Sequence, residues 1–459
     1  MANRGGHAVV LGASMAGLLA ARVLTEFYER VTVVERDELD DTPEPRRGVP
    51  QSRQPHALLA RCGLILEELF PGIGEDLVAG GAHEWRDGDL SRFRGHFGGH
   101  LLLRTGRLPN PGGLVNYYAG RPFLEWQVRR RVLGLPAITV LDRHDLDTLI
   151  SAGGEVIGAR VTSRTDHTTA DLFADLVVDA TGRGSRTPVF LEQMGYPRPR
   201  EDRLTVNVSY VSMPMRIPDG LLSEYAIFDL FRAGRPYGYA MFRCEHDTWV
   251  VGAGTLGSDA QPPASVAELM DFLERLVPAD VFAALGAGEP LADVALHRFP
   301  ANRWRRYDKL TKSPRGLVVV GDAVCSFNPI YGQGMTVASI EAMVLRDCLQ
   351  HGGHNVHRRF HRAAARTVRI AWRTAVGSDL ALPEVEGRRT YTSKVTNAYI
   401  ERVLQAAESD PWVLEQFLLV TGMLEPPSRL LRPAMMRRVA RHRRRSNESR
   451  FAAEVSATA

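Results

Sequence analysis

Two glycine-containing segments have the residue types and spacing to bind a ligand. The first is Gly12-Ala-Ser14-Met-Ala-Gly17, which follows one apolar strand pattern and precedes a helical pattern, with Glu35 at the end of the next apolar strand. A glycine-rich turn lets a pyrophosphate approach the free amides and positive dipole end of the following helix. An acid after the second strand is placed to accept hydrogen bonds from a ribose. This segment therefore predicts a dinucleotide-binding site.

The second segment runs from Gly321-Asp322 through Pro329 to Gly332 and Gly334. An acid at the end of a buried strand can hold a polyhydroxyl chain. A turn fixed by proline then leads to a helix start, whose amides can meet an anionic ring edge. A helix-capping aspartate would explain Gly-Asp alone. The length of the run favours a ligand site.

Two other interpretations of glycine motifs fail. A hydrolase nucleophile elbow at Ser14 would need earlier strands, and only eleven residues precede Gly12. The run Gly252-Ala-Gly254-Thr-Leu-Gly257 matches the dinucleotide pattern formally, but the residues after it do not begin a helix. We expect one dinucleotide site, at the N-terminus.

The elements that must position these residues follow from apolar periodicity. Strands are predicted at 7–11, 31–35, 138–141, 155–162, 176–178 and 316–320, and helices at 15–28, 56–69, 122–133, 332–349, 356–376, 394–407 and 411–422. Residues 88–114 are glycine-rich and are expected to be irregular. Residues 204–251 alternate in strand fashion and are rich in aromatics, which predicts an antiparallel sheet apart from the parallel one.

Composition narrows the class of protein. The chain has 459 residues, 44% of them hydrophobic and 24% charged, which is typical of a folded globular protein. The net charge is +4; residues 431–459 carry eight arginines and two glutamates, or +6, so the remainder is near −2. A nucleic-acid-binding body needs a broad basic face and is excluded. The basic tail (Arg437, Arg438, Arg441, Arg443–Arg445) is interpreted as a solvated helix end, with contact to an acidic partner or membrane as the alternative.

The sequence also bears on compartment and metals. No apolar run approaches 18 residues without a charge, so no membrane span is predicted, and the apolar N-terminus is explained by a βαβ unit rather than a signal peptide. The four cysteines form no CxxC pair, which indicates free thiols in a reducing cytoplasm. The histidines at 351, 354, 357 and 361 lack a carboxylate partner and are predicted to be a surface cluster; no metal site is expected.

With these motifs, the chain resembles the class A flavoprotein monooxygenases of the para-hydroxybenzoate hydroxylase type over roughly residues 7–350. The resemblance implies FAD as cofactor and an α/β fold. A doubly wound, Rossmann-like FAD-binding domain (1–80, 115–200 and 298–355) would be interleaved with a β-rich substrate domain (81–114 and 201–297) and followed by a C-terminal helical region (356–459). The implied FAD contacts are Gly12, Ser14, Met15, Ala16, Gly17, Glu35, Arg36, Arg47, Gln51, Arg121, Asp322, Pro329, Gly332, Gly334 and Met335.

The run Arg46-Arg47-Gly-Val-Pro-Gln51, together with His56, is similar to a branch of that family from actinobacterial polyketide pathways. The branch includes polyether epoxidases and a flavin-dependent dialkyldecalin synthase. The resemblance implies a tailoring enzyme that epoxidises or hydroxylates a large apolar substrate through a flavin hydroperoxide. The alternative is a non-redox (4+2) cyclase whose FAD is a structural scaffold. Tyr210, Phe228, Tyr239 and Phe327 are expected to line an apolar substrate pocket.

The chain departs from the family pattern at three places. The central Asp-Gly motif is replaced by Ala180-Thr181-Gly182-Arg183, a histidine after Gly-Asp-Ala by Cys325, and an asparagine after the last glycines by Thr336. These changes leave the expected FAD contacts in place. Because the Asp-Gly motif contributes to pyridine-nucleotide docking in that family, NAD(P)H binding is left open.

Overall fold

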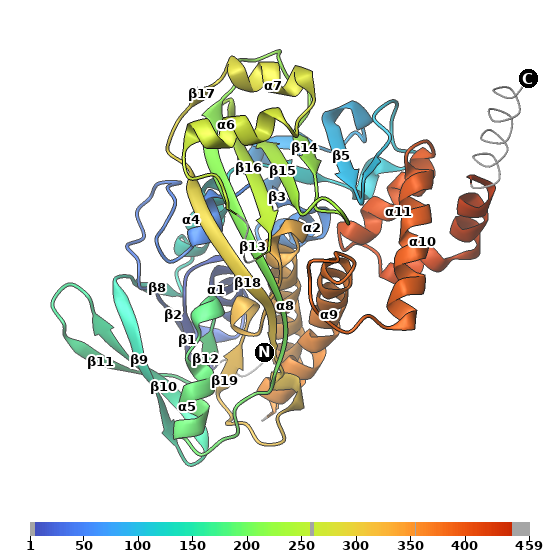
Figure 1. Ribbon diagram of the computed structural model, residues 1–459. Helices are drawn as coiled ribbons and strands as arrows, with labels where there is room; N and C mark the ends of the chain where they lie inside the picture. Colours follow the sequence, from blue (N-terminus) through green and yellow to red (C-terminus); the bar gives the residue numbers. More distant parts are fainter. Residues whose placement is uncertain (1–4, 258–260, 354, 443–459) are drawn as a thin grey trace, which may run out of the picture.

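A five-stranded parallel sheet organises the N-terminal part of the fold, and the α/β class expected from the sequence is confirmed (Figure 1). The computed structural model describes residues 5–257, 261–353 and 355–442. The strand order is β19 (Leu317–Val319), β12 (Leu176–Asp179), β1 (Gly5–Leu11), β2 (Tyr28–Val34) and β8 (Ile138–Leu141). Every neighbouring pair is parallel.

Different elements cover the two faces of this sheet because alternate residues of each strand point to opposite sides. Ala8 and Val10 of β1 pack with α1 (Met15–Leu24), α2 (Ala60–Leu69), α3 (Ile73–Ala79), α4 (Arg121–Leu133) and α8 (Gly334–Gln350). Val9 and Leu11 pack on the other side. That side is covered by an antiparallel meander of β9 (His144–Ala152), β10 (Glu155–Ser163) and β11 (Thr169–Phe173), by α5 (Thr187–Gln193) and by α9 (Val356–Asp379).

A larger mixed sheet lies beyond the parallel one. Its order is β20 (Cys325–Ser326), β18 (Ala295–Arg305), β13 (Glu201–Arg216), β16 (Thr248–Leu256), β15 (Tyr237–Arg243), β14 (Ala226–Asp229), β5 (Phe93–Phe97) and β6 (His100–Leu101), with β17 (Glu289–Pro290) paired to β13. One face packs against α6 (Val266–Glu274) and α7 (Ala279–Gly286). The other packs against α10 (Tyr391–Ala407) and α11 (Pro411–Thr421).

The remaining elements are short. A small sheet joins β3 (Ala57–Leu58), β7 (Asn116–Tyr118) and β4 (His83–Trp85). The 3-10 helices are η1 (Pro50–Arg53), η2 (Leu90–Arg92), η3 (Pro111–Gly113), η4 (Gly182–Gly184), η5 (Tyr307–Lys309), η6 (Gly321–Ala323), η7 (Pro329–Tyr331) and η8 (Pro427–Leu431). Within the described residues, no helix is long and apolar enough to span a bilayer.

Several element boundaries differ from the sequence-based expectations. α1 ends at Leu24 rather than residue 28, because Tyr28 pairs with Gly5 and opens β2. α2 begins at Ala60 because residues 57–58 pair with β7. The segment 88–114, expected to be irregular, supplies β5 and β6 to the large sheet. β9, β11, β18 and α5 to α7 were not predicted; β9 is half-exposed and α5 is only 7 residues long, so their periodicity is weak.

The histidines of α9 also require a correction, because they are not a surface cluster. His357 and His361 are buried. Nε2 of His361 accepts a hydrogen bond of 3.2 Å from the amide of Val319, and burial lowers the pKa of His361 to about 3. Within the described residues, no group of His, Cys, Asp and Glu side chains is arranged to hold a metal ion. His354 lies outside the described residues.

The first turn of α1 lies so close to β1 that only glycine fits at position 17. A Cβ there would lie 1.8 Å from the carbonyl oxygen of Gly12, which is backbone and cannot rotate away. We expect Gly17→Ala to lower the free energy of unfolding by about 1–3 kcal/mol or more, because the helix must move off the strand. Gly184→Ala is the control, since a Cβ there meets no heavy atom within 4 Å. Urea unfolding measures both, and equal stabilities would contradict the close packing.

Candidate functional site

The N-terminus of α1 has no side-chain cap among the described residues, although a serine occupies the capping position. The Ser14 hydroxyl instead donates to Oε2 of Glu125 at 2.8 Å. The amides of the first helical turn therefore remain available, and no acid lies in that turn. Uncapped amides at the positive end of a helix dipole form a site for an anion. This is the position at which the sequence predicts a pyrophosphate.

Glu125 of α4 is the centre of a buried ionic cluster. Its Oε2 accepts hydrogen bonds from Ser14 and, at 3.0 Å, from Nη2 of Arg121, and its Oε1 contacts Nη2 of Arg46. Burial acts to raise the pKa of Glu125, but Arg121 and Arg46 outweigh it, and the pKa lies below the usual value. Glu125 therefore carries a negative charge inside the protein, which is stable only because both guanidiniums accompany it.

Glu35, the predicted ribose ligand, joins the same cluster. Its Oε2 accepts the amide of Ala13 at 2.7 Å and lies 3.4 Å from Nη1 of Arg46. Its Oε1 accepts the amide of Asp37 at 3.1 Å. A carboxylate has about four acceptor positions. Glu35 therefore keeps acceptor capacity for a ribose while being fixed beside the first turn of α1.

The structure distinguishes the two neighbouring arginines at 46 and 47. Arg46 points inward to Glu35 and Glu125, and its Nη1 has no hydrogen-bond partner in the described part of the chain. Arg47, the predicted FAD contact, is exposed and lines a surface pocket of about 240 Å³ together with Arg46 and Arg129. Sequence reasoning missed Arg46, since adjacent arginines in a loop give no signal of which one points inward.

Other predicted contacts surround this cluster. Arg121 is buried at the start of α4, and its Nη2 donates to the Ser14 oxygen at 3.1 Å. Met15 is buried, and Ala16 is half-buried. Arg36 is exposed and Gln51 is half-buried, and neither side chain makes a polar contact with the described residues. The structure therefore groups Gly12, Ser14–Gly17, Glu35 and Arg121, and leaves Arg36, Arg47 and Gln51 outside the cluster.

The second glycine-rich segment lies against the first. A Cβ at Gly321 would lie 2.8 Å from the Cβ of Ala16, so η6 and the start of α1 are adjacent. The Asp322 side chain that follows is exposed, yet desolvation raises its pKa, against the opposing effect of Arg183, Arg121 and Arg303. Asp322 therefore lies beside the start of α1, in the field of three arginines. We call this region, bordered by α1, η6 and η7, the candidate site.

The loop from Pro329 to Gly334 forms another border. Gly332 and Gly334 are exposed, and Met335 is buried at the start of α8. A Cβ at Gly334 would meet no heavy atom within 4 Å. α8, like α1, has no side-chain cap and no acid in its first turn within the described residues. Two uncapped helix N-termini thus face the candidate site.

A buried polar network that sequence reasoning missed fixes this loop. Asp379, at the end of α9, accepts hydrogen bonds from the Asn302 amide at 2.6 Å, the Asn328 amide at 3.0 Å and the Tyr331 hydroxyl at 2.7 Å. Burial raises the pKa of Asp379. The Tyr210 hydroxyl donates to Oδ1 of Asn328. Asp379 is a positioning residue for the loop, and it lies outside every recognised motif.

The η4 loop contains the segment in which Thr181-Gly182 replaces the Asp-Gly motif of the family. Two residues before Thr181, Asp179 is completely buried, and its carboxylate accepts hydrogen bonds from Ser185, Thr187 and both the amide and the hydroxyl of Thr181. Its carboxylate closes its own loop and is not available to a ligand. The next charged residue of this loop, Arg183, contacts the large sheet: its guanidinium lies 4.7 Å from the centre of the Phe299 ring.

Two histidines near the candidate site are neutral at neutral pH. Burial, with repulsion from Arg121, lowers the pKa of His56 to about 4. Burial and Arg183 likewise lower the pKa of His297. Nδ1 of His56 lies 2.7 Å from the carbonyl oxygen of Gln54, so this nitrogen carries the hydrogen and Nε2 is an acceptor.

The four aromatic residues predicted to line one pocket are not brought together. Phe228 packs against Phe93 and Phe97 on the face of the large sheet that contacts α10 and α11. The assignment of Tyr239 to the same pocket is wrong, since its side chain packs on the opposite face, against α6 and α7. Phe228 pairs across the strands with residue 240, so these two side chains share a face of the sheet. Tyr239, one residue earlier, therefore points to the opposite face, because successive side chains of a strand alternate. Tyr210 belongs to the loop network, and Phe327 lies in the core beside the parallel sheet.

Comparisons with known proteins bear on the family and the fold. No family model matches the chain. Protein Rv3254 of Mycobacterium tuberculosis is 38% identical over 444 residues, covering 92% of this chain and 91% of its own. Among solved structures, the flavin-dependent brominase Bmp2 is similar with a TM-score of 0.65 at 12% identity, over 97% of this chain and 100% of that one. The p-nitrophenol 4-monooxygenase PnpA of Pseudomonas putida is similar with a TM-score of 0.64 at 16% identity, over 93% and 100%.

The buried carboxyl group of Glu341, on α8, should make the stability of the protein depend on pH. It accepts the amide of Gly321 at 2.6 Å, and burial raises its pKa to about 8 from 4.5. The folded state therefore holds a proton that the unfolded state loses, so Glu341 costs stability increasingly as pH rises from about 4.5 to about 8. Glu341→Gln keeps the acceptor and removes the titration. Its melting temperature should exceed that of wild type by a margin that grows between pH 5 and pH 8.5.

The control is Glu386→Gln, which neutralises an exposed acid. Its effect on melting temperature should be small at both pH values. A difference between Glu341→Gln and wild type that does not change with pH would contradict the assignment of a protonated, buried Glu341.

Proposed function

We propose that this chain, which belongs to the same family as Protein Rv3254 of Mycobacterium tuberculosis, is an FAD-dependent monooxygenase that oxygenates a large apolar small molecule. One observation carries the proposal: the N-terminus of α1, which has no side-chain cap within the described residues, lies against the turn that carries Asp322, and α8 packs beside α1 and also begins without a side-chain cap. The similarity in fold to a flavin-dependent brominase and a p-nitrophenol monooxygenase supports it.

The residues of the candidate site fit FAD. Glu35 would accept from the adenosine ribose, and the first turn of α1 with Arg121 would bind the pyrophosphate. The unpartnered Nη1 of Arg46 and Nε of Arg121 are donors that an anionic ligand would satisfy. Asp322 would accept from the ribityl chain, and the glycine loop with the N-terminus of α8 would contact the flavin ring. The open space at Gly334 gives that ring room to approach the backbone.

FAD, when bound and reduced, would supply the activation of dioxygen and the transfer of one oxygen atom to substrate. The protein's own residues position the cofactor and substrate. Asp379 holds Asn328 and Tyr331, and so fixes the loop that would meet the flavin ring. His56 is neutral at neutral pH, so it can accept a hydrogen bond without adding positive charge near Arg121.

An apolar substrate is supported by the aromatic inner face of the large sheet. The Phe228 ring meets the rings of Phe93 and Phe97 edge to face, with ring centres 5.2 and 5.1 Å away. Phe97 also meets Phe417 of α11 edge to face, at 5.3 Å. Several apolar side chains of this cluster remain half-buried, which suits a surface that can take up an apolar molecule. The Arg-Arg-Gly-Val-Pro-Gln run supports a polyketide-type substrate.

A second candidate is a non-redox cyclase in which FAD is a structural scaffold. The observation that favours it is the sequestration of Asp179, which leaves the η4 loop without a free acid where the family has Asp-Gly. A pocket that holds a flexible apolar chain in a reactive geometry would be enough for such a reaction.

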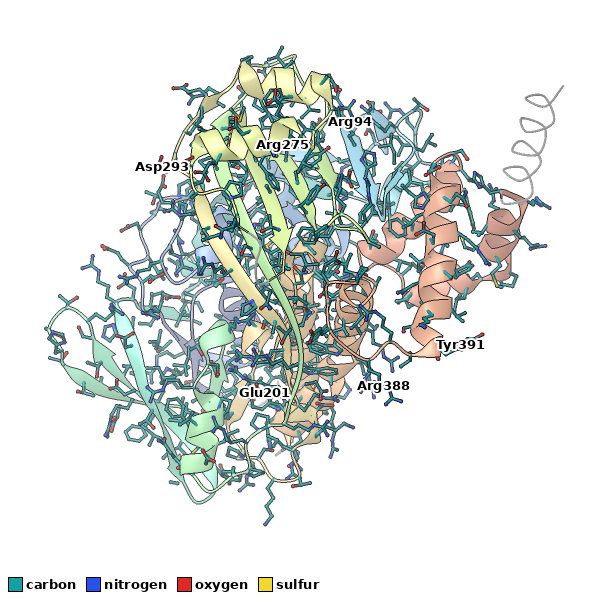
Figure 2. The ribbon with its side chains drawn as sticks, in the orientation of Figure 1. Arg94, Glu201, Arg275, Asp293, Arg388 and Tyr391 are labelled. Carbon is teal, nitrogen blue, oxygen red and sulfur yellow. The ribbon has the colours of Figure 1, made fainter. Side chains whose placement is uncertain are left out.

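Single substitutions test the cofactor site. Glu35→Ala should weaken FAD binding by about 1–3 kcal/mol, the usual cost of losing a hydrogen bond to a charged group. Asp322→Ala should also reduce FAD occupancy and leave the fold intact, because its side chain is exposed. Asp293→Ala, an exposed acid on the segment before β18 (Figure 2), is the control. The measurement is FAD titration by fluorescence quenching. Full flavin occupancy in Asp322→Ala would reduce Asp322 to a helix-capping role.

The monooxygenase and cyclase proposals differ in their requirements, because only the monooxygenase needs dioxygen and a reductant. Since the η4 loop lacks a free acid, NADPH should reduce the bound flavin slowly without substrate, below the usual enzyme turnover range of about 1–1,000 per second. Substrate should then accelerate reduction, and the product should gain one oxygen atom in the mass spectrum. Product of unchanged mass formed anaerobically, without reductant, would establish the cyclase instead. Rapid reduction by NADPH without substrate would contradict the inference from Thr181 and Asp179.

A further inference from the structure

α9 is divided lengthwise into an apolar stripe and a basic stripe. Phe360, Ala364, Val368, Ala371 and Ala375 are buried and face the protein core. Two positions before each of these lie Arg358, Arg362, Arg366, Arg369 and Arg373, on the opposite side of the helix, since two residues correspond to about 200° of rotation. The helix therefore shows one continuous face of arginine to the outside.

The side chains of Arg362, Arg366, Arg369 and Arg373 are exposed, and none of them forms a side-chain hydrogen bond or ion pair with the residues the structure describes. The four lie within twelve residues, and the eleven steps from the first to the last cover about 16 Å of helix. Other exposed arginines, such as Arg160, Arg164 and Arg216, pair with acids at distances of 2.6 to 3.2 Å. α9 itself contains one acid, Asp379, which is buried.

Exposed apolar side chains accompany the stripe. Ile370 lies within it, between Arg366 and Arg373, and is 39% exposed. The loop after α9 carries exposed Arg388, and three residues later Tyr391 opens α10 with 83% of its surface exposed. Val395, one turn further, is 52% exposed. Figure 2 shows Arg388 and Tyr391 on the right-hand side of the view, on the connection that leads from α9 into α10.

Three classes of partner can be compared by how they would use both the arginines and the exposed apolar side chains of this surface. A second copy of the chain is disfavoured because two arginine stripes would repel each other. Nucleic acid would use the arginines and could stack a base on the tyrosine, but it would gain little from exposed Ile370 and Val395. An anionic lipid surface uses both, because arginines bind phosphate headgroups and tyrosine favours the bilayer interface. The stripe is long enough to contact several headgroups at once.

We propose that the arginine face of α9, with Tyr391 and Val395, is a docking surface for anionic lipid membranes. The protein would bind at the membrane surface through headgroup contacts and shallow insertion of apolar side chains, without a spanning helix. The candidate site and its residues are not part of this surface.

Vesicle sedimentation tests the proposal with the full-length protein. Wild type should bind vesicles of 30% phosphatidylglycerol in phosphatidylcholine at least about ten times more tightly than it binds vesicles of pure phosphatidylcholine. Its affinity for the anionic vesicles should fall as the salt concentration rises. The variant R362Q/R366Q/R369Q/R373Q should lose at least about tenfold in binding, since each arginine near an anionic surface contributes substantially. The corresponding lysine variant should keep most of it, because it retains the charge. Y391S/V395S should weaken binding severalfold.

The matched control is R160Q/R164Q/R216Q/R275Q, which removes the same net charge from exposed positions away from α9 and should bind as wild type. Melting temperature and bound FAD are measured for every variant, so that loss of the cofactor is seen separately from loss of membrane binding. Equal vesicle binding by the glutamine variant and its control would overturn the proposal. So would absence of wild-type binding at 0.1 M salt, as would be found if the stripe serves an acidic protein or a nucleic acid.

Discussion

The negative charge of Glu125 is the constraint on which the candidate site depends. A carboxylate removed from water is tolerated only when cations and hydrogen bonds replace its hydration, and removing one partner of such a cluster typically costs about 3–5 kcal/mol. Here Arg46, Arg121 and the Ser14 hydroxyl supply the replacement. The cluster joins three segments that are distant in sequence: the turn before α1, the loop after β2 and the start of α4. Their relative positions are therefore fixed by one ionic centre.

The same cluster determines what α1 can bind. The Ser14 side chain is directed to this cluster, where its hydroxyl donates to Glu125 and its oxygen accepts from Arg121, and within the described residues it accepts no hydrogen bond from the first turn of α1. α8 repeats the arrangement at the other border of the site, where the loop before the helix is held by Asn328 and Tyr331 on Asp379. α1 begins just after the carboxyl end of the parallel strand β1, and Asp322 follows the parallel strand β19; this edge is where ligands bind in open α/β sheets. α9 contributes on both sides, since its last residue fixes this loop and its outer face carries the arginine stripe.

Sequence patterns predicted the parts of the fold that depend on local rules. The Gly12–Gly17 turn, Glu35 after the second strand and Asp322 after the last parallel strand were identified from spacing, and the structure brings the segments that carry them together. The parts that failed depend on tertiary context. Arg46 and Arg47 are indistinguishable in sequence, and Asp379 ends a helix more than forty residues beyond the last motif. Tyr239 and Phe228 are both aromatic positions of a strand pattern, and only the register of β14 with β15 shows that they face opposite sides.

Flavin adenine dinucleotide is the proposed ligand of the candidate site bordered by α1, η6 and η7. The most direct measurement is identification of the cofactor released from the purified, denatured protein by liquid chromatography and mass spectrometry. We expect FAD at close to one per chain, either as purified or after incubation with FAD and removal of the excess. FMN in its place would contradict the roles of Glu35 and the α1 N-terminus. No flavin retained even after incubation with FAD would contradict the site as a whole.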